Sequence, residues 1–156
     1  MMAIITAEVP QWQATTLAQL VEEKRDAFRV LIATLLSLRT QDKTTHEASG
    51  RLFLLADTPE VMVDLPVAVV EKAIYPVGFY TTKAKNIISI CRILVDEYDG
   101  RTPDDLDELL ALPGVGRKTA NLVITLGFDK PGICVDTHVH RIANRWGYVA
   151  TKTPDE

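Results

Sequence analysis

Apolar residues recur at helical spacing along almost the whole chain, and this periodicity restricts the fold more than any other feature. In residues 82–98, for example, Ile87, Cys91 and Leu94 fall on one side of a helix, whereas a half-buried strand would need alternation at every second position. The stretches that a strand would use, such as residues 132–135, are short. We therefore expect an all-α protein with short connections.

Start and stop signals place the expected helices along the chain. They are predicted over residues 16–24, 26–39, 41–55, 59–64, 66–74, 82–98, 103–112, 117–126 and 137–146. A Thr-Pro-acid sequence, which combines an N-cap with a proline suited to the first turn, occurs three times. These sequences are Thr58-Pro59-Glu60, Thr102-Pro103-Asp104 and Thr153-Pro154-Asp155. The third has too few residues after it to form a helix, so we expect a fragment or a truncated gene product.

Composition and cysteine usage narrow the class of protein. The chain is 47% hydrophobic and 24% charged, which is typical of a soluble globular protein. Its longest apolar run, Val30–Leu38, is too short to span a bilayer. Cys91 and Cys134 are far apart and belong to no Cys/His cluster, which argues against a disulfide scaffold or a zinc site. We expect a cytoplasmic protein with no membrane association.

The net charge of −4 does not favour nucleic-acid binding, but the charges are unevenly distributed along the chain. Residues 113–156 carry 6 basic and 4 acidic side chains, while the acidic excess lies in residues 1–112. A local basic face on an acidic body is compatible with DNA binding.

The sequence LLALPGVGRKTAN, from Leu109 to Asn121, joins two predicted helices through the short turn Pro113–Gly116. Glycines at alternate positions allow positive φ angles and leave backbone amides uncovered by side chains. The unpaired N–H groups and the positive dipole end of the second helix point the same way, an arrangement suited to a DNA phosphate. A plain helix–helix turn that needs glycine for tightness explains the same residues.

Lys118 and Asp136 are the candidate reactive residues. Lys118 lies in the first turn of the second helix, where its amine would act as a Schiff-base nucleophile or simply pair with phosphate or water. Asp136 would cap the last helix, or stabilise positive charge on a sugar ring as a glycosidic bond breaks. His138 and His140 are two residues apart and do not share a helical face, which argues against a metal pair.

LPGVGRKTAN followed by VDTHVHRIANR resembles the helix-hairpin-helix and Gly/Pro-Asp region of the endonuclease III family of DNA glycosylases. Upstream, VLIATLLSLRTQDKTT and VGFYTTKAKNIISICRIL resemble two further segments of that family in the same order. The resemblance covers roughly residues 27–148 and implies an all-α helix-hairpin-helix glycosylase fold.

The resemblance also assigns roles. It implies that Lys118 attacks the sugar C1′ and forms an imine, and that Asp136 is the essential aspartate. It implies Na⁺ or K⁺ at the backbone carbonyls of Leu112 and Val115, and a partner that is duplex DNA with damaged bases or abasic sites. DNA contacts are expected from Arg39, Gln41, Phe79, Tyr80, Leu112, Gly114, Val115, Gly116, Arg117 and Thr119.

Two departures from the family pattern matter. The usual glutamine after the second helix corresponds to Arg39, with Gln41 two residues later, so the lesion preference is not fixed by the resemblance. The four-cysteine loop that holds a [4Fe-4S] cluster in most members is absent, so no cofactor is expected beyond the monovalent cation.

The resemblance divides the chain into an N-terminal segment of a terminal lobe (1–26), a helical lobe with the hairpin (27–130) and an incomplete start of the C-terminal part of the terminal lobe (131–156). If the chain ends at Glu156, some apolar side chains lose a partner. We then expect low stability, self-association or rearranged termini. The residues concerned are Ile4, Ile5, Trp12, Leu17 and Ile142.

The leading hypothesis is a bifunctional DNA glycosylase and abasic-site lyase acting on oxidised pyrimidines in duplex DNA, associated with the nucleoid. The alternatives are a non-catalytic helix-hairpin-helix DNA-binding module and an inactive truncated fragment.

Overall fold

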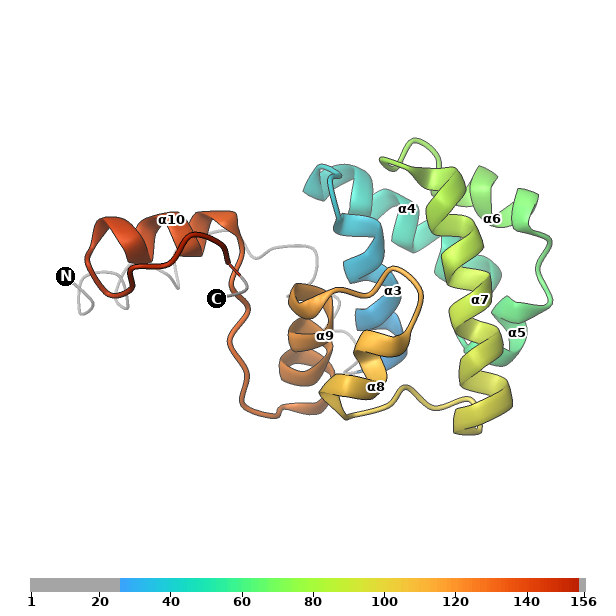
Figure 1. Ribbon diagram of the computed structural model, residues 1–156. Coiled ribbons are helices and arrows are strands. Elements are labelled where there is room, and N and C mark those ends of the chain that lie inside the picture. Colours follow the sequence, from blue (N-terminus) through green and yellow to red (C-terminus); the bar gives the residue numbers. More distant parts are fainter. Residues whose placement is uncertain (1–25, 155–156) are drawn as a thin grey trace.

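The computed structural model describes residues 26–154, and within them every regular element is helical (Figure 1). The all-α prediction is therefore confirmed, while the helix predicted over residues 16–24 lies outside the described residues. The elements are α3 (Ala27–Ser37), α4 (Asp42–Leu55), α5 (Pro59–Val63), α6 (Val67–Ile74), α7 (Tyr80–Tyr98), α8 (Leu106–Ala111), α9 (Arg117–Leu122), the π-helical segment η2 (Val123–Gly127) and α10 (Thr137–Arg145).

Helix α3 is the centre of the molecule, because it is apolar on nearly all sides. The Asp26 carboxylate caps it and accepts the N–H of Phe28 at 2.9 Å. The helix packs against α4, α7, α9 and η2, and side chains such as Leu31 and Ile32 are fully buried. In residues 26–154, no helix is long and apolar enough to cross a membrane.

Helix α7 is the longest element and supports α5 and α6 on one flank. It begins two residues before the predicted start, because Phe79 takes a left-handed conformation at φ 57° and directs the chain into the helix at Tyr80. It ends where Gly100, at φ 73°, donates its N–H to the carbonyl of Leu94 at 2.8 Å. Gly100 is thus the stop signal that the sequence predicts.

The Thr-Pro-acid signals have different outcomes. Thr58 caps α5 as predicted, with its hydroxyl accepting from the N–H of Val61 at 3.5 Å. The start predicted at Thr102 is wrong, because α8 begins only at Leu106, where the Asp105 carboxylate accepts two first-turn N–H groups. At the third signal, Thr153 and Pro154 are not helical, and Asp155 lies outside the described residues.

Helix α10 lies apart from the helices that surround α3 (Figure 1). None of its residues is buried, and its apolar residues Val139 and Ile142 are exposed, as is Trp146 just after it. The boundary predicted between residues 130 and 131 stays a prediction. The other residues predicted to lose an apolar partner, which are Ile4, Ile5, Trp12 and Leu17, lie outside the described residues.

Candidate active site and DNA-binding surface

The hairpin predicted from the two glycines is present between α8 and α9. Gly114 has a φ of 77°, a left-handed conformation that favours glycine, and a Cβ there would lie 2.5 Å from the Asn86 Nδ2 atom. Gly116 differs from the expectation, because its φ of −99° is extended backbone. A Cβ at Gly116 would meet no atom within 4 Å. This glycine therefore leaves open space beside the start of α9 rather than making the turn.

The hairpin exposes backbone more than side chains. Leu112 and Val115 are buried, and the Val115 N–H closes the turn on the Leu112 carbonyl at 3.1 Å. Thr119 is also buried, so its side chain does not reach the surface and the DNA contact predicted for it would have to come from its backbone. Arg117 is exposed, and no side chain caps the first turn of α9. The surface of the hairpin thus offers backbone amides beside a cation.

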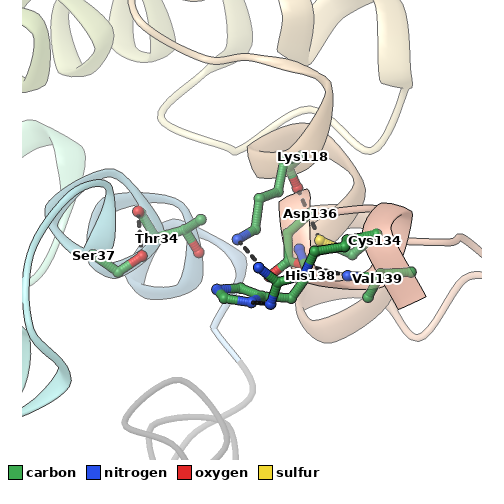
Figure 2. A network of polar contacts seen from close by, with 8 residues as sticks. Thr34, Ser37, Lys118, Cys134, Asp136, His138 and Val139 are labelled. Carbon is green, nitrogen blue, oxygen red and sulfur yellow. Dashed lines mark hydrogen bonds and ion pairs between the residues drawn. The ribbon is translucent and has the colours of Figure 1, made fainter. Parts of the chain in front are cut away.

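Lys118 and Asp136, which are 18 positions apart in the sequence, form an ion pair in the structure. The Lys118 Nζ atom lies 3.6 Å from the Asp136 Oδ2 atom, and the two side chains are 43% and 31% exposed. Figure 2 shows Lys118 extending from α9 with its ammonium on the side of Asp136 and His138. The amine is therefore both accessible to a large ligand and next to a carboxylate.

Asp136 caps α10 with one carboxylate oxygen and pairs with Lys118 through the other, while its role at a sugar ring stays a prediction. Its Oδ1 atom caps α10 by accepting the N–H groups of His138 at 2.9 Å and Val139 at 2.8 Å. Its Oδ2 atom remains for Lys118. The hydrogen bond from the Val139 N–H, with the positive charge of Lys118 also contributing, lowers the pKa of Asp136 against the opposing effect of burial. The carboxylate is therefore held in its charged form.

The segment before Asp136 lies along α9. The Cys134 thiol is 3.7 Å from the Lys118 carbonyl and donates to it. The His138 Nδ1 atom lies 3.2 Å from the Arg141 guanidinium. Because a guanidinium only donates, that ring nitrogen acts as the acceptor. Arg141 thus adds a second cation beside His138, whose backbone N–H the Asp136 carboxylate accepts.

The two loops expected to contact DNA upstream of the hairpin are in contact with each other. Arg39, at φ 53°, follows α3, and its guanidinium carbon lies 5.7 Å from the centre of the Phe79 ring. Phe79 is 62% exposed. Gln41 is exposed at the start of α4, and Tyr80 is half-buried with its ring edge-to-face on Tyr75. Arg39 and Phe79 thus form a pair on the surface of the molecule.

A cavity of about 410 Å³ separates the Arg39–Phe79 pair from the hairpin. Leu35 and Leu38 of the α3 end, Asn86 of α7 and Gly114 of the hairpin are among its lining residues. Its wall also includes Lys83, which no sequence motif indicates. Lys83 precedes Ile87 by four positions and therefore lies on the apolar face of α7, which is the signal that would have found it.

The thiols in the described residues do not fit an iron-sulfur cluster. Cys91 is buried in the core, where burial raises the pKa of its thiol to about 12, and Cys134 is half-buried beside α9. A four-thiolate cluster needs four cysteines close together, and the chain has 2. No His/Cys/Asp/Glu group able to hold a metal ion is found in residues 26–154.

The HhH-GPD superfamily of base excision DNA repair proteins matches residues 32–156, which include the hairpin, Lys118 and Asp136. The chain belongs to this superfamily. It is 52% identical over 134 residues to Endonuclease III of Thermotoga maritima, covering 86% of this chain and 63% of that protein. It is 43% identical over 129 residues to Endonuclease III of Escherichia coli, covering 83% of this chain and 61% of that protein.

A solved structure agrees with these relatives. The chain superposes with a TM-score of 0.79 and 41% identity on a trapped endonuclease III–DNA covalent intermediate, covering 84% of this chain and 62% of that one. The helix-hairpin-helix DNA glycosylase fold and the resemblance to endonuclease III are thereby confirmed. The chain spans about three fifths of the length of these relatives.

Proposed function

We propose that this protein is a DNA glycosylase with abasic-site lyase activity that acts on oxidised pyrimidines in duplex DNA. The observation that carries the proposal is the accessible Lys118 amine held 3.6 Å from the Asp136 carboxylate, at the start of the second hairpin helix. The endonuclease III relatives and the covalent DNA complex of an endonuclease III support it.

The proposed reaction begins with loss of a proton from the Lys118 ammonium, for which the Asp136 carboxylate is the adjacent acceptor. The free amine attacks C1′, and the bond from C1′ to the base breaks with its electron pair going to the base, which takes up a proton. The base takes this proton from Asp136, and the carboxylate, negatively charged again, stabilises the positive charge that develops on the sugar. Neither role requires a metal ion at these two side chains.

Strand cleavage then proceeds from the imine. The ring oxygen leaves C1′ and takes up a proton as the C1′–nitrogen double bond forms. Loss of the C2′ proton expels the 3′ phosphate from C3′. Water finally hydrolyses the imine and returns the free Lys118 amine.

In this proposal the duplex is held at two places. The backbone from Leu112 to Gly116 binds a phosphate, assisted by Arg117 and by the start of α9. Arg39, Gln41, Phe79 and Tyr80 occupy the space that a flipped nucleotide leaves in the stack.

We further propose that the hairpin binds a monovalent cation and that the protein is located with the nucleoid. Na⁺ or K⁺ would bind the carbonyls of Leu112 and Val115, the first of which already accepts the Val115 N–H and keeps a lone pair. A duplex substrate places the protein with the nucleoid in the cytoplasm.

Reductive trapping tests the proposal. The full chain is incubated with an abasic-site duplex and sodium borohydride, and the covalent adduct is resolved by denaturing electrophoresis. Lys118→Gln should abolish the adduct. Lys130→Gln is the matched control, because Lys130 also pairs with an aspartate, Asp104, and is 45% exposed. This control should trap as well as the wild type.

The outcome separates the three hypotheses. An adduct that depends on Lys118 supports the enzyme, and release of oxidised pyrimidines from lesion duplexes then tests the substrate class. Salt-sensitive duplex binding without an adduct supports the non-catalytic module. Absence of both supports the inactive fragment.

We also propose that the exposed apolar residues of α10 promote self-association. Val139, Ile142 and Trp146 are exposed on or next to this helix, and contiguous apolar surface of that kind favours burial against protein. Sedimentation velocity of the wild type and of Ile142→Ser tests this. A wild type that remains monomeric at high concentration would contradict it.

A further inference from the structure

Lys83 is a buried cation whose charge faces the end of α3 rather than solvent. Its side chain is 8% exposed. Its Nζ atom donates to the carbonyls of Leu36 at 2.9 Å and Leu38 at 2.6 Å, and to the Thr40 hydroxyl at 3.3 Å. The two carbonyls are among those that the helix end leaves without intrahelical partners. Lys83 therefore fixes the course of the chain on both sides of Arg39.

The same hydroxyl connects this segment to the turn before α7. Thr40 Oγ1 accepts the N–H of Gly78 at 3.2 Å. A Cβ on Gly78 would lie 2.6 Å from the Arg39 carbonyl oxygen, so any other residue would push the two segments apart. Lys83, Thr40 and Gly78 thus form one continuous link between the end of α3 and the start of α7.

The link ends at two residues in an unusual conformation. Arg39 and Phe79 both have left-handed φ angles, of 53° and 57°. Residues other than glycine keep such angles only where the surrounding structure determines them. The guanidinium of Arg39 stands over the exposed Phe79 ring, and this contact depends on the relative position of the two loops.

We propose that Lys83 is a positioning residue that holds these two loops in register, so that Arg39 and Phe79 meet a duplex with a missing or flipped base as one preformed unit. The inference rests on the proposed function for the assignment of Arg39 and Phe79 to DNA. Lys83 itself touches neither DNA nor the reacting sugar. Its contribution is preorganisation, which removes the cost of ordering the pair on binding.

The electrostatics of Lys83 agree with this role. Burial lowers its pKa to about 8, so the ammonium is an unfavourable group in this position despite its three acceptors. An apolar side chain of similar length would fill the same space without that penalty. The ammonium thus serves the hydrogen bonds to the end of α3, which an apolar side chain could not make.

The test compares three variants of the full chain. Lys83→Met removes the ammonium, Lys83→Arg keeps a donor cation, and Lys85→Met removes the same charge from an exposed position of α7. Circular dichroism establishes that each variant is folded. Amide hydrogen exchange then reports the Gly78 N–H, and titration compares an intact duplex with one that carries a tetrahydrofuran abasic analogue.

Lys83→Met should speed exchange of the Gly78 amide and reduce the preference for the abasic duplex by about tenfold, the effect of losing a charged hydrogen bond. Lys85→Met should change neither the exchange of the Gly78 amide nor the preference for the abasic duplex. Both variants lose one positive charge, so each should bind the intact duplex slightly and equally more weakly. Lys83→Arg should restore part of the preference. At saturating protein, the rate of borohydride trapping should be unchanged in Lys83→Met, while the half-saturating concentration rises.

Three results would overturn the inference: unchanged Gly78 exchange in Lys83→Met, a retained preference for the abasic duplex, or an equal loss for both duplexes. Failure of the proposed function has a different signature, which is a wild type without an adduct and without a preference between duplexes. In that event Gly78 exchange still decides whether Lys83 couples the loops.

Discussion

Replacing Asp136 by asparagine and by alanine should separate its helix cap from its charge. Asparagine keeps an acceptor oxygen for the N–H groups of His138 and Val139 and caps helices about as well as aspartate. Alanine keeps neither function and costs about 1 kcal/mol of cap stability. That energy corresponds to about a fivefold shift in the population of frayed α10.

The charge is the larger effect once DNA covers the site. At 3.6 Å, two unit charges attract by about 1 kcal/mol in water and about 5 kcal/mol at an effective dielectric of 20. Because Lys118 and Asp136 are partly exposed, the lower figure applies to the free protein. A bound duplex excludes water, so loss of the carboxylate should slow trapping by roughly 10²–10³-fold.

Single-turnover trapping and amide exchange are the two assays. Asp136→Asn should lose the trapping rate and keep protection of the His138 and Val139 amides, whereas Asp136→Ala should lose both. A trapping rate for Asp136→Asn within about threefold of the wild type would refute the role of the charge, since the cap alone would then explain the residue.

The remaining predictions concern pH, the hairpin and the thiols. Because burial lowers the pKa of Lys83 to about 8 from 10.5, the unfolded chain binds more protons than the folded one between these values. The free energy of unfolding of the wild type, measured by urea denaturation relative to that of Lys83→Met, should therefore rise with pH across this window by at most about 3 kcal/mol. A difference between the two that falls with pH would contradict the burial of the Lys83 charge. Gly114→Ala should cost about 1–2 kcal/mol, because of its φ of 77°. The Cβ added by Gly116→Ala meets open space, so this variant should change the free energy of unfolding by less than about 0.5 kcal/mol. Equal destabilisation by Gly114→Ala and Gly116→Ala would contradict the hairpin geometry. With a thiol reagent at pH 8, Cys134 should react in the folded protein and Cys91 only after unfolding, since Cys91 is fully buried and burial raises the pKa of its thiol to about 12; rapid reaction of two thiols would contradict this.

Helix positions followed from the sequence where the signal was local. Apolar spacing placed α3 and α7, and Gly100 marked the end of α7, because these features act within one or two turns. The sequence predicts too early a start for α8, because Thr102 and Asp105 are both good caps. In the structure Asp104 turns to Lys130, with their charged atoms 2.6 Å apart, and Asp105 provides the cap.

The site required contacts that no local pattern encodes. The sequence motifs marked Lys118 and Asp136 separately, but their ion pair depends on the course of residues 128–136 along α9. The burial of Lys83 depends on the packing of α7 against α3. In the sequence Lys83 looks like the nearby surface residue Lys85, although it lies four positions before Ile87 on the apolar face of α7. Gly114 and Gly116 look equivalent in sequence, yet only Gly114 has a positive φ.

Peptide mapping of the borohydride-reduced adduct tests the central claim most directly. After nuclease digestion and proteolysis, mass spectrometry should find the sugar remnant on the Lys118 side chain. Modification of another amine, such as Lys83 or the N-terminus, with Lys118 unmodified, would contradict the assignment of Lys118 as the nucleophile.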